Sequence, residues 1–206
     1  MRFSKKELAG NHARLLERNE VYRRAGYDDE KDLRFVVSKT LPLKGRILEI
    51  GTGKGRFLTA LLRRVRLITT IDVNADEQRF ARMNVAFERR RGRARFVIAD
   101  ARRLPWRDGS FDAVVSMNAL HHMPQLARVL GEIRRVVRPG GKVVLADFNR
   151  RGFAVFDRIH RREGRVHERS KYKLEDVVGY FERWGWRVAR FRGDCEDVVV
   201  ARKKES

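Results

Sequence analysis

The chain has 206 residues, a single cysteine and a formal net charge of +21, from 48 lysines and arginines against 27 aspartates and glutamates. This length suits one domain with its own core, and the lone Cys195 excludes an internal disulfide. No apolar run reaches the roughly 20 residues of a membrane helix, and no signal-peptide core follows the first residues, which predicts no membrane insertion and a cytoplasmic location.

The positive charge has two interpretations. Acidic residues are also plentiful, so a surface of solvated ion pairs accounts for it, and we favour this interpretation. The other is attraction to a polyanion or to an acidic substrate. Composition alone leaves both open.

Two helical patterns precede the first predicted strand. They cover residues 4–20 and 29–40, with Asp28 and Asp29 available to cap the second helix and Pro42 closing the region. We expect this N-terminal helical addition to act as a lid or as part of the substrate site.

A glycine-rich turn follows the first predicted strand, residues 46–50. Within Glu49-Ile50-Gly51-Thr52-Gly53-Lys54-Gly55, three alternate glycines leave the backbone free of Cβ atoms, so it can lie against a flat ligand. A dinucleotide fingerprint needs a different spacing, because the third glycine, Gly55, comes one residue early. A P-loop needs Ser or Thr after Lys54 and a longer loop before it, so it is excluded.

The pattern Glu-x-Gly-x-Gly-x-Gly after a first strand resembles motif I of the class I S-adenosylmethionine-dependent methyltransferases, in particular the type 11-like, small-molecule branch. The resemblance covers residues 45–148 strongly and 172–203 moderately. It implies S-adenosylmethionine as the cofactor. It also implies a Rossmann-like, seven-stranded sheet that ends in an antiparallel hairpin.

The rest of the chain alternates between strand and helix patterns, which predicts an α/β fold with a doubly wound, mostly parallel sheet. The six further strands are predicted at 67–72, 93–99, 111–117, 142–148, 186–191 and 198–201. A helix is predicted after the first strand, with an apolar face made of Phe57, Leu58, Leu61, Leu62 and Val65, and another after the second strand up to about residue 90. Two more are predicted from about Pro124 to a break at Pro139-Gly140-Gly141 and over 173–184. The last two strands are joined by a short connection, which requires an antiparallel pair.

Acidic residues stand at the carboxyl ends of predicted strands, where doubly wound sheets bind ligands. Asp72 ends the second strand, and its carboxylate can accept both ribose hydroxyl protons; capping of the next helix is the alternative. Asp100 ends the third strand, and the resemblance implies that it contacts the adenine amino group while the Ala101 amide reads the ring. Bonding of Asp100 to turn amides is the alternative. The resemblance further implies that Glu49 faces the methionine end of the cofactor.

The segment Ser116–Met123 resembles the motif IV region of the small-molecule branch, at the edge of the site where the methyl group is transferred. Enzymes that methylate the amines of bases carry Pro-Pro and an aromatic residue after this asparagine, whereas here Ala119-Leu120 follow Asn118. Carbon-5 cytosine enzymes need a Pro-Cys pair here, and Cys195 lies far away. Together, the cofactor-binding residues that the resemblance implies are Glu49, Gly51, Thr52, Gly53, Gly55, Asp72, Val73, Asp100, Ala101 and Asn118.

Two adjacent histidines, His121 and His122, are the candidate catalytic residues. Neighbours on a helix or turn point about 100° apart and no third ligand is evident, so we expect no metal. Because the histidine side chain in general can exchange a proton near neutral pH, one of the two could act as a general base for an acceptor hydroxyl. Packing, or covering the cofactor, is the alternative role.

The basic segment Asn149–Lys171, which includes Phe153, Phe156 and His167, is the predicted substrate-side insertion, with a solvated amphipathic helix as the alternative. We therefore divide a single domain, 1–206, into the helical region 1–42, the cofactor-binding core 43–148, the insertion 149–171 and the terminal helix and hairpin 172–206.

The predicted function is methyl transfer to a small-molecule acceptor of anionic or aromatic character by in-line displacement. An RNA-directed methyltransferase and a non-catalytic, cofactor-binding partner subunit are the alternatives, and the sequence does not predict the oligomeric state.

Overall fold

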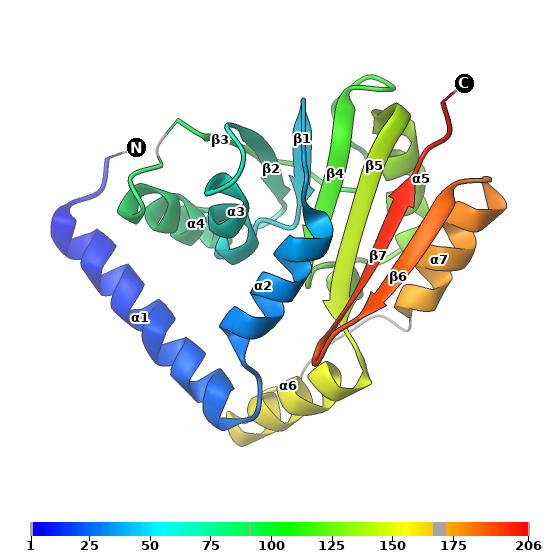
Figure 1. The fold of residues 1–206 in the computed structure, drawn as a ribbon. Helices are drawn as coiled ribbons and strands as arrows, with labels where there is room; N and C mark the ends of the chain where they lie inside the picture. Colours follow the sequence, from blue (N-terminus) through cyan, green and yellow to red (C-terminus); the bar gives the residue numbers. More distant parts are fainter. Residues whose placement is uncertain (1, 91, 167–171, 206) are drawn as a thin grey trace.

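A seven-stranded sheet with the order β3-β2-β1-β4-β5-β7-β6 forms the centre of the computed structural model, which describes residues 2–90, 92–166 and 172–205 (Figure 1). The strands are β1 (Ile47–Ile50), β2 (Ile68–Asp72), β3 (Ala94–Ile98), β4 (Phe111–Met117), β5 (Val137–Phe148), β6 (Arg187–Arg192) and β7 (Glu196–Arg202). Strands β1 to β5 pair in parallel, and β7 is antiparallel to both of its neighbours. The predicted fold class is confirmed.

Helices cover both faces of this sheet (Figure 1). They are α1 (Lys5–Arg24), α2 (Asp29–Thr40), α3 (Arg56–Leu62), α4 (Ala75–Phe87), α5 (Leu126–Val136), α6 (Arg150–Arg162) and α7 (Leu174–Arg183), with the short 3₁₀ helix η1 (Leu120–His122) after β4. In β4, Val114 packs with α5 and α7, whereas its neighbours Ala113 and Val115 pack with α2, α3 and α4. Successive strand residues point to opposite faces, so a strand buried on both faces needs the continuous apolar runs seen in the sequence.

The boundary between α5 and β5 differs from the prediction. Helix α5 begins at Leu126 and ends at Val136, and β5 begins at Val137, where a start at 142 was expected. Arg138 precedes a proline, which disfavours a helical backbone, so the helix ends before Pro139. Val137 pairs with Phe111, and a register shift in the pairing of β5 with β4 accommodates the Pro-Gly-Gly stretch within the strand.

The first helix is longer than predicted, since α1 continues to Arg24. Ser4 and Glu7 form a capping box at its start, and Gly26, with a φ of 95°, follows its end. Asn11 is the one α1 residue that is buried among those described. Figure 1 shows α1 along one side of the molecule, reaching from α4 to α6.

The predicted insertion forms α6, whose residues Val155, Phe156 and Ile159 pack against Tyr27 and Phe148. The amphipathic-helix interpretation therefore holds for the part of the segment that the structure describes. His167 and the rest of 167–171 lie outside the described residues.

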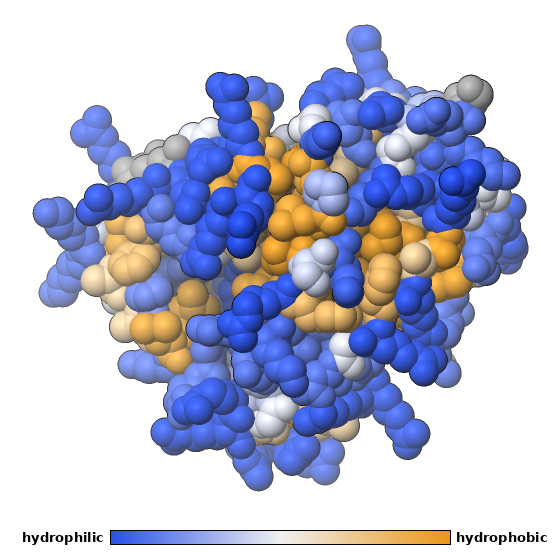
Figure 2. Space-filling view, in the orientation of Figure 1, coloured by the Kyte–Doolittle hydropathy of each residue, from blue (hydrophilic) through white to orange (hydrophobic). Residues whose placement is uncertain are grey.

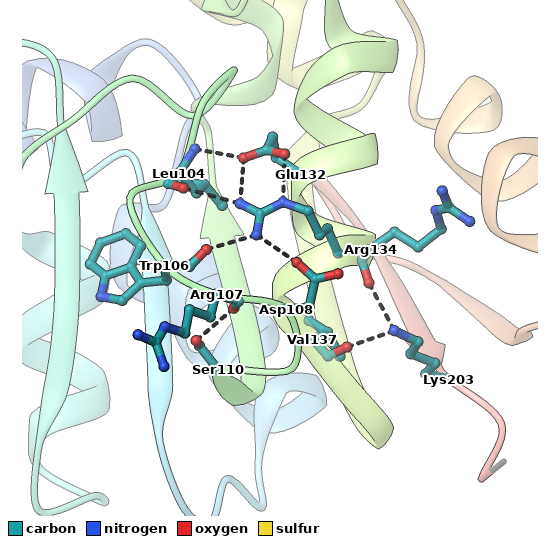
Figure 3. Close-up of polar contacts among 10 residues, drawn as sticks. Leu104, Trp106, Arg107, Asp108, Ser110, Glu132, Arg134, Val137 and Lys203 are labelled. Carbon is teal, nitrogen blue, oxygen red and sulfur yellow. Dashed lines mark hydrogen bonds and ion pairs between the residues drawn. The ribbon is translucent and has the colours of Figure 1, made fainter.

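The loop from β3 to β4 is fastened to α5 by Arg135 (Figure 3). Its guanidinium donates to the carbonyls of Leu104 at 3.0 Å and Trp106 at 2.7 Å, and it pairs with Asp108 at 2.9 Å and Glu132 at 2.8 Å. The Glu132 carboxylate also accepts the Leu104 N–H at 2.7 Å. This network fixes the loop against the end of α5, close to the first residues of β4 and β5.

Within the described residues, no helix is long and apolar enough to cross a membrane. Hydrophilic residues cover most of the face seen in Figure 2, around a hydrophobic area near its middle. That surface agrees with a chain of net charge +21.

Candidate active site

A cavity of about 1290 Å³ lies at the carboxyl ends of β1, β2, β3 and β4. Its walls come from the glycine-rich turn, the strand ends, the segment after β4 and one face of α1. Cavities that hold one ligand are typically about 300–1,000 Å³. This cavity is larger than that range.

The glycine turn gives the cavity a bare backbone floor. Gly51 has a φ of 83°, and a Cβ there would overlap the side chain of Ala119, so the turn lies directly against the segment after β4. A Cβ on Gly55 would come within 2.8 Å of Ala81 in α4. Gly53 differs, because no heavy atom lies within 4 Å of its Cβ position. The backbone at Gly53 is therefore open to a flat ligand.

Asp72 joins the end of β2 to this turn. Its Oδ2 accepts the Gly53 N–H at 2.8 Å, and its Oδ1 accepts the Asn74 N–H at 2.9 Å. Helix α4 is capped by Asn74, whose side chain accepts the amides of the first turn, so the capping role proposed as an alternative for Asp72 belongs to Asn74. Val73, 70% exposed, lines the cavity beside them.

Asp100 and Ala101 line the cavity at the end of β3. The Asp100 carboxylate pairs with the Arg102 guanidinium at 2.6 Å and accepts the Arg102 N–H at 2.8 Å. This pairing holds the pKa of Asp100 below its ordinary value. The turn-amide bond suggested as an alternative is therefore present, and the carboxylate, whose side chain is 40% exposed, remains ionised and within reach of a ligand.

Glu49 lies behind the turn rather than in the cavity wall. Its Oε2 accepts a hydrogen bond from the Thr70 hydroxyl at 2.5 Å, and that hydroxyl lies 2.6 Å from the Thr52 hydroxyl, which does line the cavity. Burial raises the pKa of Glu49 to about 8, and its Oε1 has no hydrogen-bond partner among the described residues. Glu49 thus reaches the cavity through Thr70 and Thr52.

The structure separates the two candidate histidines. His121 is buried, and its ring Nδ1 lies 2.5 Å from Oδ1 of Asp147. Its backbone N–H donates to Oδ2 of the same carboxylate at 3.0 Å. It faces a second cavity of about 890 Å³, whereas the exposed His122 lines the first. Among the residues described, no group of three potential metal ligands occurs.

Sequence reasoning missed a buried polar cluster beside the segment that follows β4. Asn118, in the left-handed region with a φ of 53°, donates from Nδ2 to Oε1 of Glu196 at 2.7 Å, and the Tyr27 hydroxyl donates to the same oxygen at 2.8 Å. Burial raises the pKa of Glu196 well above its ordinary value. The one available signal was a glutamate at the start of an apolar strand pattern. The hydrogen bond from Tyr27 to Glu196 joins residues 169 positions apart, so no local sequence pattern indicates it.

A family model described as a methyltransferase domain matches residues 48–145. The 27-O-demethylrifamycin SV methyltransferase of Amycolatopsis mediterranei is 37% identical over 117 residues, covering 52% of this chain and 41% of that protein. The ubiquinone/menaquinone biosynthesis C-methyltransferase of Geotalea daltonii is 29% identical over 131 residues, covering 62% and 56%. The chain thus spans less than two thirds of the length of these curated relatives.

Solved structures share the fold. A methyltransferase from Thermotoga maritima described as dependent on S-adenosylmethionine superposes with a TM-score of 0.68 at 18% identity, covering 96% of this chain and 99% of that one. A second, from Methanosarcina mazei, gives a TM-score of 0.61 at 20% identity, with coverages of 83% and 98%. Residues 48–145 therefore form a methyltransferase domain, and the sheet order and the glycine turn identify it as one of the class I S-adenosylmethionine-dependent type, whose cofactor is S-adenosylmethionine.

Proposed function

We propose that this chain transfers the methyl group of S-adenosylmethionine to a small-molecule acceptor by in-line displacement. The observation that carries the proposal is the junction of Asp72 with Gly53, where a carboxylate and an open backbone meet at the carboxyl ends of parallel strands. Each carboxylate oxygen keeps a lone pair beyond its amide bond, so Asp72 can accept the two ribose hydroxyls. Asp100 and the Ala101 amide, at the next strand end, suit the adenine ring.

The bound cofactor supplies a methyl group already activated on a sulfonium. The protein then has to orient the acceptor and exclude water. Alignment of reacting groups is worth on the order of 7–11 kcal/mol, whereas a general base contributes about 10²–10⁴-fold. Asn118 and His122 line the cavity where the acceptor must approach. If the accepting group has to lose a proton, we propose His122 as the base, since His122 lines this cavity whereas His121 lines the other.

The relatives support a small acceptor, since their names describe methylation of a rifamycin and of a quinone. A second candidate, an RNA acceptor, is favoured by the net charge of +21. The two differ in their response to salt. A protein that binds RNA displaces counterions from the phosphates, so added salt opposes binding and the affinity falls steeply. Turnover of a small molecule should change little.

The test is an assay with S-adenosylmethionine labelled in its methyl group, supplied with a metabolite extract and, separately, with total RNA, at low and moderate salt. We expect the label in the small-molecule fraction at both salt concentrations. Label in RNA that disappears at moderate salt would favour the RNA acceptor. Tight cofactor binding with no label in any fraction would favour a non-catalytic partner subunit and would contradict the proposal.

A further inference from the structure

One face of α1 forms a wall of the large cavity. The six α1 residues that line it are spaced by three or four positions and so lie on the same side of the helix: Asn11, Arg14, Leu15, Arg18, Asn19 and Tyr22. Four of the six carry an amide or a guanidinium. A helix that packs on a protein core normally turns an apolar stripe inward. The inner face of α1 is instead mostly polar, and one of its polar side chains, Asn11, donates to Asn84 of α4 at 2.7 Å.

Charged side chains of both signs line the cavity. Its carboxylates, Asp72, Glu77 and Asp100, come from the ends of β2 and β3 and from the start of α4. They suit the nucleoside and the positive charge of the donor, and Asp100 also pairs with Arg102. Arg14 and Lys54 line the cavity as well, and no ion pair is found for either among the described residues.

Two more arginines line the cavity, and both are held in place by carboxylates. Arg56 forms an ion pair with the buried Asp29, and Arg18 forms one with Glu163 of the turn after α6. Helix α1 is therefore tied to α6 through Arg18, which fixes its arginine face over the cavity. Arg14, one turn earlier on the same face, is left to bind a ligand.

A chain of contacts links this face to Asn118. The Arg18 guanidinium lies 4.8 Å from the ring centre of Tyr22, and Tyr22 packs edge-on against Tyr27 with ring centres 6.1 Å apart. Tyr27 in turn reaches Asn118 through Glu196. Because Tyr22 and Asn118 line the same cavity, a group bound along the inner face of α1 shares that cavity with the proposed site of methyl transfer.

We propose that the acceptor is a carboxylic acid on an apolar body, and that Arg14 binds its carboxylate while Arg18 holds α1 in place. The inference rests on the proposed function, because it concerns the second ligand of the same cavity. The planar fork of arginine matches a carboxylate in two parallel hydrogen bonds. Leu15, Phe57, Phe80 and Met123, which also line the cavity, provide the apolar surface for the remainder. The carboxylate of the donor's methionine tail is the competing source of the same chemistry.

Calorimetry can separate these sources. The protein is first saturated with S-adenosylhomocysteine, the product form of the cofactor, and is then titrated with decanoate and with 4-hydroxybenzoate, each compared with its neutral amide. The variants are Arg14→Gln and a matched control, Arg23→Gln, on the same helix but outside the cavity lining.

We expect at least one acid to bind ten times more tightly than its amide, and Arg14→Gln to abolish that preference while leaving the affinity for S-adenosylhomocysteine within twofold. Arg23→Gln should change neither. The inference is overturned if acid and amide bind equally or not at all. It is also overturned if Arg14→Gln weakens S-adenosylhomocysteine as much as the acid, since the donor's tail is then the ligand. Failure of the unaltered protein to bind S-adenosylhomocysteine would instead remove the proposed function itself.

Discussion

Replacing Asp72 by alanine tests the cofactor assignment at its most specific contact. Asp72 holds the Gly53 and Asn74 amides at 2.8 and 2.9 Å and is the proposed acceptor of the two ribose hydroxyls. Loss of hydrogen bonds to a charged group at this site should weaken S-adenosylhomocysteine binding by about 2–3 kcal/mol, or roughly 30- to 160-fold.

The same substitution also affects the protein without ligand. Water can reach the exposed Asn74 amide, but the Gly53 amide is partly buried, so the free energy of unfolding should fall by about 1–2 kcal/mol. Asp72→Asn keeps one acceptor oxygen and the side-chain shape, so its binding loss should be smaller. Asp76→Ala, an exposed acid outside the cavity lining, serves as the control.

Isothermal titration calorimetry measures the affinities, and thermal unfolding measures the stabilities separately. A folded Asp72→Ala protein that binds S-adenosylhomocysteine within twofold of the unaltered chain would refute the role of this carboxylate. An equal loss in Asp76→Ala would show that the effect is one of net charge.

Three further substitutions test separate polar contacts in the fold. Burial raises the pKa of Glu49 from 4.5 to about 8, so the stability tied to its protonated form is complete below pH 4.5 and is lost as pH rises toward 8. In denaturant titrations, the free energy of unfolding of Glu49→Gln should rise relative to that of the unaltered chain by on the order of 1.4 kcal/mol per pH unit across that window. A difference between the two proteins that does not depend on pH would contradict this. Arg135→Ala should lower the free energy of unfolding by about 2–4 kcal/mol, whereas Arg34→Ala, which breaks an exposed pair, should cost under about 1 kcal/mol; equal losses would count against the network. Tyr27→Phe removes a donor from the buried Glu196 and should cost about 1–3 kcal/mol in the same assay, so an unchanged midpoint would exclude a contribution from that bond.

Local patterns in the sequence predicted much of the fold. The order strand, glycine turn and helix from β1 to α3 follows from residues close together in the chain, as does the spacing that buries one face of α5. The parallel sheet follows from alternating patterns, and the antiparallel end from a short connection. These features depend on neighbours that can be read from a short window.

Other features depend on contacts between distant segments, and the sequence did not reveal them. His121 and His122 are adjacent in the chain, yet they line different cavities. Asp147, near the end of β5, holds His121 in the wall of the second cavity, whereas His122 lines the first. The bond from Tyr27 to Glu196 forms only when the N-terminal addition docks beside β7. Which face of α1 turns inward is likewise decided by docking, because its outer and inner faces are both polar.

A crystal structure with S-adenosylhomocysteine is the most direct measurement of the central claim, that the glycine turn and the carboxylates at neighbouring strand ends hold the cofactor. The account predicts the ligand across Gly53, with its ribose on Asp72 and its adenine beside Asp100. A ligand bound elsewhere at full occupancy, or no binding at saturating concentration, would contradict it.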